Sequence, residues 1–284
     1  MHEFQCLEVE GARTNLAPLS LTSEIKFIYR MKNVKVAVII PARYDSYRLP
    51  GKLILPEVKA ITGKYLIEHV YENVRKSKRV GKIIVATDST VIYDIVKGFG
   101  GEAEMTSMSH ASGTDRIAEV AERLADDIIV NVQGDEPEVS AVMVEQVADV
   151  LLKNTEAVMS TLASRIEDAE ELVNPNVVKV VLDNNGYALY FSRSQIPYVR
   201  DSKCPIEEPG IIFLRHLGIY AYRRDFLLKY IRLPVSPLEN SEKLEQLRAL
   251  TNGYKIKVAI TDSAFKGIDT REDLNSFLER HKHD

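Results

Sequence analysis

From residue 34 onward, short apolar runs alternate with segments whose apolar residues recur at helical spacing. This alternation constrains the fold more than any other feature, because strands and helices that take turns along a chain form layered α/β sheets. Continuous apolar runs, which suit strands buried on both faces, occur at 34–40, 83–87 and 128–132. Helical spacing occurs at 65–76, at 90–97, from 114 onward and around 144–151. The order predicts a doubly wound α/β fold with a largely parallel sheet.

The alternation is interrupted at 176–235. The runs 177–182 and 187–191 flank the sequence DNNG, which predicts a hairpin. A further strand-like run follows at 216–222. We therefore expect 176–235 to form an antiparallel insertion or a dimer-forming subdomain.

The α/β pattern resumes after this interruption, so the main domain is expected to consist of 32–175 and 236–284. Its last part contains a helix near 239–251, a strand at 255–260 and a final helix that begins with a capping box at Thr270.

Residues 1–31 lack any sustained periodicity. We expect them to be a disordered extension, an upstream start or a remnant foreign to the domain, because disorder concentrates at chain ends. No feature of this segment favours a regulatory arm.

The composition argues against several classes of protein. Among the 284 residues, 41 acidic and 37 basic side chains give a net charge of -4, so the overall charge favours neither nucleic acid nor an anionic membrane as a partner. No apolar run approaches the roughly 20 residues of a membrane-spanning helix. The two cysteines, Cys6 and Cys204, form neither a CxxC pair nor a disulfide framework, and we expect a cytoplasmic protein.

Some familiar motifs are matched only in part. The letters GFGGEA at 98–103 are similar to a dinucleotide-binding loop, but they follow a helix rather than a strand and predict a helix end and turn. Gly51-Lys52 and Gly63-Lys64 lack the remaining residues of a P-loop. No zinc-protease or serine-hydrolase motif occurs.

Polar loops follow two of the predicted strands, at the edge where parallel sheets bind their ligands. After the first strand, Arg43, Arg48 and Lys52 share one loop, which suits a triphosphate; the alternative is an exposed basic loop. After the strand at 128–132, Asp135 is placed to hold a magnesium ion together with phosphate oxygens. The alternative for Asp135 is an acidic turn at the entry of a helix.

Further residues are candidates for a site. Asp269, directly before the last helix, is either a second metal carboxylate or a turn residue. The sequence HASGTDR at 110–116 either meets a base or ribose through its backbone groups or is a plain helix N-cap. His216 and Tyr220 are four residues apart and so share one face of a strand. Glu245 is either a site residue or part of a solvated helix face.

Nine segments match one protein family in chain order, between about residues 34 and 274. They are IPARYDSYRLPGK at 40–52, IIVATD at 83–88, HASGTDRIAEV at 110–120, VNVQGDEP at 130–137, NPNVVKVVLD at 174–183, YALYFSRSQIPY at 187–198, RHLGIYAY at 215–222, SPLENSEKLEQLRAL at 236–250 and GIDTREDL at 267–274. In these segments the chain resembles the 3-deoxy-manno-octulosonate cytidylyltransferases, also called CMP-Kdo synthetases. So many matches in order are far more specific than any one motif.

The resemblance implies a Rossmann-like nucleotidyltransferase fold with a smaller antiparallel insertion at 176–235, used for sugar binding and for a homodimer. It implies a reaction in which the anomeric hydroxyl of the acid sugar Kdo attacks the α-phosphorus of CTP and releases pyrophosphate. The product, CMP-Kdo, would serve lipopolysaccharide synthesis, and Mg2+ would be the cofactor. Such chemistry depends on positioning and charge neutralisation more than on a protein nucleophile.

The resemblance also assigns roles to single residues. Lys52 and Asp135 would act in catalysis, and Asp135 and Asp269 would bind magnesium. Nucleotide-binding positions are matched by Ala42, Arg43, Lys52, Ser112, Gly113, Arg116 and Gln133. Sugar-binding positions are matched by Arg193, His216, Tyr220, Glu245 and Gln246. Arg193 would face the sugar carboxylate, because its planar fork can bond both oxygens.

The chain departs from the family pattern at a few positions. Asp45 and Tyr47 stand where small residues are usual, and the stretch 55–63 is longer than the usual short turn. Tyr198 stands where tryptophan is common, and Arg271 where proline is common. None of these removes an expected phosphate or metal ligand. The alternatives are a cytidylyltransferase for 8-amino-Kdo or another acid sugar such as a sialic acid, and a non-catalytic nucleotide-binding module.

Overall fold

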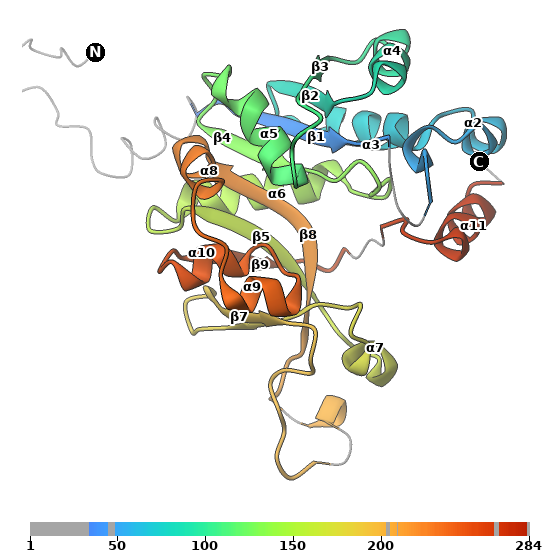
Figure 1. The fold of residues 1–284 in the computed structure, drawn as a ribbon. Helices are drawn as coiled ribbons and strands as arrows, with labels where there is room; N and C mark the ends of the chain where they lie inside the picture. The colour runs from blue at the N-terminus through green and yellow to red at the C-terminus, as the bar shows by residue number, and fades with distance from the viewer. Residues whose placement is uncertain (1–33, 45–48, 203–204, 209, 264–266, 283–284) are drawn as a thin grey trace, which may run out of the picture. The chain divides into compact units, whose positions relative to one another are not determined.

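The sheet consists of two groups of strands that meet at one long antiparallel strand (Figure 1). The computed structural model describes residues 34–44, 49–202, 205–208, 210–263 and 267–282. The extension expected at 1–31 lies outside these residues. Within Lys35–Asp284, which forms one compact unit, the strand order is β3-β2-β1-β4-β8-β5-β9.

The first group of strands is parallel throughout. It contains β1 (Val36–Ala42), β2 (Lys82–Thr87), β3 (Ala103–Met105) and β4 (Ile128–Asn131). Every residue of β1 is buried, because β1 is paired on both sides and lies inside the sheet. The strands predicted at 34–40, 83–87 and 128–132 are confirmed.

The second group contains β5 (Met159–Arg165) and β9 (Ile256–Ile260), which are parallel to each other. The strand β8 (Leu214–Arg223) lies between β4 and β5 and is antiparallel to both. Parallel pairs are thus present in both groups, and the predicted α/β fold class is confirmed.

A hairpin lies off this main order of strands. It is formed by β6 (Lys179–Leu182) and β7 (Ala188–Ser192), as the sequence DNNG predicts. Gly186 in its turn has a φ of 73°, a backbone conformation that favours glycine. The hairpin reaches the main sheet where Lys179 of β6 pairs with Arg215 of β8.

The range 176–235 therefore contains two different parts. The hairpin is peripheral to the strand order, but β8 runs through the middle of the main sheet. Residues of β8 alternate mostly between buried and half-buried, which signals a strand without identifying its partners. Those partners are set by contacts that are distant along the chain, so the limits of the expected insertion do not coincide with a boundary in the sheet.

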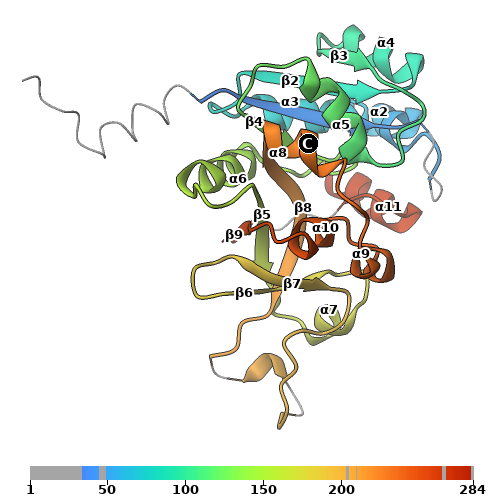
Figure 2. The same cartoon turned by 60° about the vertical axis from the view of Figure 1, so that its left-hand side comes forward.

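Helices cover both faces of the sheet (Figures 1 and 2). Two of them, α5 (Gly113–Glu122) and α8 (Arg224–Tyr230), share a core with Ala37 and Ile39 of β1. On the opposite face α3 (Leu66–Arg75) contacts α6 (Ala141–Lys153). The helix α4 (Thr90–Gly98) packs against β2 and β3. The helices predicted at 65–76, at 90–97, from 114 onward and around 144–151 are confirmed as α3, α4, α5 and α6.

Several short helices connect these elements. They are the 3-10 helix η1 (Lys52–Ile54), α2 (Pro56–Thr62), α7 (Ala169–Val173) and the 3-10 helix η2 (Pro205–Glu207). The stretch 55–63, longer than the usual turn, is thus largely a helix that begins with a proline, as helices often do.

The single helix expected near 239–251 is wrong. Two short helices form instead, α9 (Pro237–Glu242) and α10 (Leu247–Thr251). Lys243 between them has a φ of 53°, a left-handed conformation that a helix cannot continue through. Leu244 and Gln246 in the intervening turn are both buried.

The last helix, α11 (Arg271–Arg280), begins at the predicted capping box, in which Thr270 and Asp273 bond each other's main chain. No helix in the described part of the chain is long and apolar enough to cross a membrane.

Candidate active site

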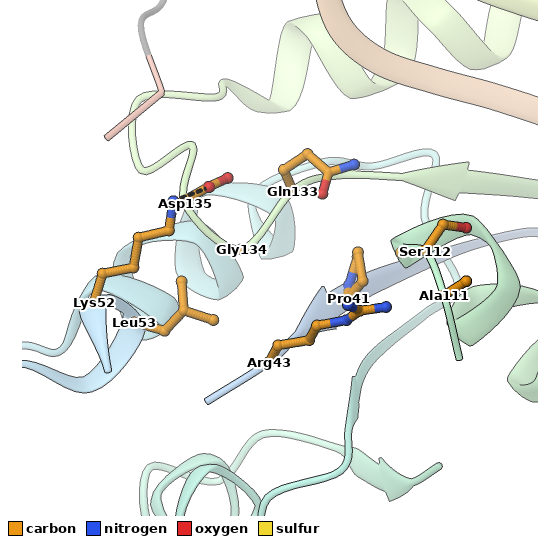
Figure 3. Close-up of a pocket in the computed structure, with 10 residues that line it drawn as sticks. Pro41, Arg43, Lys52, Leu53, Ala111, Ser112, Gln133, Gly134 and Asp135 are labelled. Atoms are coloured by element: carbon orange, nitrogen blue, oxygen red, sulfur yellow. Dashed lines mark hydrogen bonds and ion pairs between the residues drawn. The ribbon is translucent and has the colours of Figure 1, made fainter. Parts of the chain in front are cut away.

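A cavity of about 300 Å³ opens where the carboxyl ends of β1 and β4 lie side by side (Figure 3). The parallel pairing of Ile39 with Asn131 brings together the loops that follow these strands. The N-terminus of α5 and the start of η1 complete the wall. Six of the predicted site residues line the cavity: Arg43, Lys52, Ser112, Gly113, Gln133 and Asp135.

Gly134 allows the two loops to come this close. A Cβ atom at this position would lie 3.1 Å from the carbonyl oxygen of Pro41 and 3.2 Å from the side chain of Leu53. Both distances are shorter than packed carbon atoms prefer. Any larger residue would push on one of these neighbours, so glycine favours the close approach of the loops.

The ammonium group of Lys52 forms ion pairs with two carboxylates. It forms an ion pair with Asp135, toward which it points in Figure 3, and a second one of 3.3 Å with Asp269. Its Nζ also donates a 2.9 Å hydrogen bond to the carbonyl oxygen of Ile268. The main-chain N–H of Ile268 donates to the carbonyl oxygen of Asp135 at 2.9 Å, which fixes the loop before α11 beside the loop after β4. The three residues assigned to catalysis and metal binding thus lie together.

Asp135 and Asp269 have the chemistry of a magnesium site. Their side chains keep 27% and 48% of their surface exposed, and both reach the same cation, Lys52. Mg2+ at nucleotide sites is usually held by one or two carboxylates plus phosphate oxygens. Among the residues that the structure describes, no three histidine, cysteine, aspartate or glutamate side chains are grouped to hold an ion. The donor set fits an ion that shares its coordination with a phosphorylated substrate.

Arg43 lies at the end of β1, and its Nη2 donates a 2.6 Å hydrogen bond to the carbonyl oxygen of His110. The loop carrying His110 is fixed by Glu119 of α5, which accepts a 2.9 Å bond from the main-chain N–H of Ser107 and contacts His110 Nε2 at 2.6 Å. The bond from Ser107, with those from His110 and Arg123, lowers the pKa of Glu119 to about 2. A carboxylate that is ionised near neutral pH therefore supports the loop that orients Arg43.

Ser112 and Gly113 place the start of α5 at the cavity. Ser112 is the N-cap of this helix and forms a capping box with Asp115. Main-chain N–H groups at a helix N-terminus attract anions. Gln133, on the opposite wall, bonds Asn131 Oδ1 at 3.4 Å and faces the same space (Figure 3). Cationic, amide and main-chain donors thus converge on one cavity.

Two residues that match nucleotide-binding positions do not line the cavity. Ala42 is fully buried in β1. Arg116 is fully buried as well, and its guanidinium donates 2.5 Å bonds to Asp88 and Thr106. Arg116 thereby ties α5 to the segments that follow β2 and β3. Arg48 lies outside the described residues.

The residues assigned to the sugar form a second group. His216 and Tyr220 share one face of β8, as their spacing predicts, with ring centroids 5.3 Å apart. Thr161 Oγ1 lies 3.0 Å from His216 Nε2. Burial lowers the pKa of His216 to about 3 and raises the pKa of Tyr220 well above its usual value. Both side chains are therefore uncharged near neutral pH.

Glu245 and Gln246 lie in the turn between α9 and α10. Thr114 Oγ1 donates a 2.9 Å hydrogen bond to Glu245, and burial raises the pKa of this carboxyl group. The solvated helix face considered as an alternative for Glu245 does not form. Oε1 of Glu245 and Nε2 of Gln246 are buried without a hydrogen-bond partner in the described part of the chain. Buried polar atoms of this kind call for a ligand or water to bond them.

Arg193 follows β7, on the side of the hairpin. Its Nε donates to the carbonyl oxygen of Glu242 at 2.7 Å, and its Nη1 donates to that of Pro175 at 3.0 Å. The ring of Phe191, two residues earlier, lies 5.0 Å from the ring of His216. The strand that leads to Arg193 thus packs against His216 of β8.

The sequence pattern alone does not single out Glu136, although it follows Asp135 directly. Its side chain is buried between Gly218 and Gly267, and a Cβ atom at Gly218 would lie 2.9 Å from its carboxylate. Burial, with the charge of Asp135, raises the pKa of Glu136 well above its usual value. The signal in the sequence is Gly218 itself, because a glycine inside a strand often marks a close neighbour.

Two departures from the family pattern contact each other. Arg271 forms an ion pair with Glu57 of α2, which belongs to the longer stretch 55–63. Tyr198 is 80% exposed. Asp45 and Tyr47 lie outside the described residues.

Comparisons with known proteins agree with this arrangement. The cytidylyltransferase family model matches residues 37–256. A relative named 3-deoxy-manno-octulosonate cytidylyltransferase, from Trichlorobacter lovleyi, is 48% identical over 254 residues, which cover 88% of this chain and 99% of that protein. A relative of the same name from Haemophilus influenzae is 49% identical over 246 residues, covering 84% of this chain and 94% of that one.

Solved structures give the same picture. A CMP:2-keto-3-deoxy-manno-octonic acid synthetase complexed with CTP has a TM-score of 0.81 at 40% identity, covering 88% of this chain and 99% of that one. A cytidylyltransferase from Leptospira borgpetersenii, at 20% identity and a TM-score of 0.58, covers 88% of both chains and shares the fold.

Proposed function

Since this chain belongs to the 3-deoxy-manno-octulosonate cytidylyltransferase family, we propose that it transfers the cytidylyl group of CTP to Kdo. The products are CMP-Kdo, which serves lipopolysaccharide synthesis, and pyrophosphate. The observation that carries the proposal is the position of Lys52, whose ammonium holds Asp135 and Asp269 together at the wall of a cavity lined by phosphate-binding groups. A nucleotidyl transfer needs this combination of cation and paired carboxylates.

In the proposed reaction, the anomeric hydroxyl of Kdo attacks the α-phosphorus of CTP. A new oxygen–phosphorus bond forms, the bond to the β-phosphate oxygen breaks, and the hydroxyl proton leaves to solvent or a nearby base. Lys52 and Arg43 bind the triphosphate, and Lys52 offsets the negative charge that builds on the departing pyrophosphate. Arg43 is already oriented by its bond to the carbonyl oxygen of His110, whereas Lys52, whose three N–H groups bond Asp135, Asp269 and Ile268, would exchange one of these partners for a phosphate oxygen.

We propose that Asp135 and Asp269 hold Mg2+ during the reaction. A bound magnesium ion supplies positive charge to the phosphate oxygens and orients the reacting groups. Lys52 keeps the two carboxylates close together, so the chain provides both ligands in advance.

The nucleotide is proposed to lie against the start of α5. Gly113 offers a main-chain donor there, since the main-chain N–H of Ser112 is bonded to Asp115, and Gln133 offers an amide. Arg116 would act indirectly, by holding the segments around Asp88 and Thr106 against α5. A role of Ala42 would be limited to its main chain, because its side chain is buried within β1.

The sugar is proposed to lie against β8 and the turn before α10. His216 and Tyr220 would offer uncharged hydrogen-bonding groups, which suit hydroxyls better than a charged imidazole would. Oε1 of Glu245 and Nε2 of Gln246, which have no hydrogen-bond partner among the residues that the structure describes, would bond further hydroxyls. Arg193 would pair with the sugar carboxylate through its remaining N–H groups.

The cytoplasmic location and the homodimer through 176–235 also belong to this proposal. The location is supported by the low cysteine content. The dimer is supported by family resemblance alone.

A panel of acid sugars and nucleotides, with detection of released pyrophosphate, tests the proposal. We expect turnover with CTP, Kdo and Mg2+, and its loss in EDTA. A clear preference for 8-amino-Kdo or a sialic acid would show that this sugar, and not Kdo, is the acceptor. If no combination of sugar and nucleotide leads to release of pyrophosphate, the chain is a nucleotide-binding module rather than an enzyme.

A further inference from the structure

The chain around Arg193 is held from one side by Glu242 of α9. One carboxylate oxygen of Glu242 accepts a 2.9 Å hydrogen bond from the main-chain N–H of Arg193, and the other accepts a 2.6 Å bond from Ser192 Oγ. The carbonyl oxygen of Glu242 accepts the 2.7 Å bond from Arg193 Nε. A single residue of α9 thus fixes both the backbone and the side chain of Arg193.

Lys179 of β6 holds the same corner from the other side. Its Nζ donates three hydrogen bonds to carbonyl oxygens, at 2.9 Å to Asn174, 2.7 Å to Val177 and 2.6 Å to Arg193. Lys179 is fully buried. Lysine side chains are almost never fully buried unless their charge has partners. All three N–H bonds of its ammonium are used to join loops that are apart in the sequence.

These contacts restrict Arg193 at four atoms. Its main-chain N–H is bonded to Glu242, its carbonyl oxygen to Lys179, its Nε to Glu242 and its Nη1 to Pro175. Nη2 is the guanidinium nitrogen that makes no such bond within the described residues. The guanidinium is therefore held in one orientation with one edge available to a ligand.

We propose that Lys179 and Glu242 are positioning residues that hold the Arg193 guanidinium in the orientation in which it meets the carboxylate of the acid sugar. This inference rests on the proposed function, in which Arg193 binds that carboxylate. A planar fork binds a carboxylate well only when its direction is correct, and small misplacements of such groups are costly. Fixing Arg193 before the sugar arrives removes the entropy loss of ordering a long side chain on binding.

The burial of Lys179 supports a role beyond packing. An ammonium group in the interior carries a desolvation cost that an apolar residue at the same position of β6 would not have. Burial lowers the pKa of Lys179, and the carboxylate of Glu242 acts in the opposite direction. Glu242 therefore stabilises the charged form of Lys179 as well as holding Arg193 directly.

A double-mutant cycle on sugar KM tests the positioning role. Lys179→Met removes the ammonium and keeps the length of the side chain, while Glu242→Gln is the milder variant at a half-buried site. We expect each to raise the KM for Kdo about tenfold, with kcat and the KM for CTP within about threefold of wild type. In an Arg193→Ala background, neither change should raise the KM for Kdo further. Lys153→Met, at an exposed position of α6, is the matched control and should leave all constants unchanged.

Two results would overturn the positioning role. If Lys179→Met and Glu242→Gln raise the KM for Kdo as much in the Arg193→Ala background as in wild type, they do not act through Arg193. If they raise the KM for CTP equally, their role is general stability. If Lys179→Met does not fold, Glu242→Gln completes the same cycle.

A measurement without turnover separates this inference from the proposed function. The Arg193 Nε–H signal in an NMR spectrum, assigned by its loss in Arg193→Lys, should exchange slowly with solvent in wild type and rapidly in both variants. Equal exchange in wild type and variants would overturn the positioning role whatever the enzyme turns over. Absence of pyrophosphate release by the wild type, with slow exchange retained, would overturn only the proposed function.

Discussion

Thr114 and Glu245 are joined by a 2.9 Å hydrogen bond from the Thr114 hydroxyl to the Glu245 carboxylate. Thr114 belongs to the first turn of α5, beside Ser112 and Gly113 at the cavity. Glu245 belongs to the turn before α10, beside the buried Gln246. This bond connects the part of the site proposed for the nucleotide with the part proposed for the sugar.

The first prediction concerns this bond. Thr114→Val removes the hydroxyl and keeps the shape, which leaves the Glu245 carboxylate without one of its partners at a cost of about 1–3 kcal/mol. We expect the KM for Kdo to rise several-fold, with a smaller change for CTP. Steady-state kinetics with each substrate varied in turn will measure this. Thr114→Ser, which retains the hydroxyl, is the control. An unchanged KM for Kdo in Thr114→Val would show that this bond does not connect the nucleotide part of the site with the sugar part.

The second prediction concerns the carboxylates held by Lys52. Asp135→Asn keeps the size of the side chain but removes the charge that binds Lys52 and would bind Mg2+. We expect turnover to fall by at least about two orders of magnitude, as is common when a key charged group of a site is lost. The circular dichroism spectrum should be unchanged. Asp94→Asn, an exposed position on α4, should retain full activity; near-normal turnover of Asp135→Asn would remove Asp135 from the mechanism.

The third prediction concerns the pH dependence of stability. Burial, with the charges of His281 and Lys64, lowers the pKa of His69 to about 4. In the unfolded chain the pKa of histidine is about 6.5. The unfolded state therefore binds the proton more readily, and the stability from His69 is complete above pH about 6.5 and is lost as the pH falls toward 4.

Urea unfolding between about pH 7.5 and about pH 4.5 checks this, because the range covers most of the interval between the two pKa values, about 6.5 and about 4. His216, whose pKa burial lowers to about 3, contributes in the same direction. The comparison with His69→Gln isolates the part due to His69. We expect a shallower loss of unfolding free energy in that variant, and an identical pH profile would show that His69 takes up its proton equally in both states.

The fourth prediction concerns Gly218. A methyl group there would lie 2.9 Å from the carboxylate of Glu136, which is buried. We expect Gly218→Ala to lower the free energy of unfolding by about 1–3 kcal/mol, the usual cost of overpacking. Gly98→Ala is the matched control, because a Cβ at that position in α4 meets nothing within 4 Å. If Gly218→Ala leaves the free energy of unfolding unchanged, Glu136 can move away from β8.

Much of the fold follows from local signals in the sequence. The apolar run that becomes β1 is fully buried, and the sequence DNNG forms its hairpin because Gly186 can adopt a positive φ. The Thr270 capping box begins α11 because its partner Asp273 is three residues away. Signals of this kind depend only on residues that are close in the chain.

Other features depend on contacts that are distant in the chain. The place of β8 between β4 and β5 could not be predicted, because a periodic strand pattern does not name its partners. The break at Lys243 could not be predicted either, because non-glycine residues rarely adopt a positive φ. Arg116 matched a nucleotide-binding position, yet its side chain pairs with Asp88 inside the protein. Whether a charged side chain faces a ligand or a partner is decided by packing.

The central claim is that the chain transfers CMP from CTP to Kdo. Phosphorus-31 NMR of the purified protein with CTP, Kdo and Mg2+ tests it most directly, because it identifies both products in one spectrum. We expect the three CTP signals to be replaced by one phosphodiester signal of CMP-Kdo and the signal of pyrophosphate. The two products should form in equal molar amounts. CTP that stays intact, or that yields CDP and orthophosphate without a phosphodiester signal, would contradict the claim.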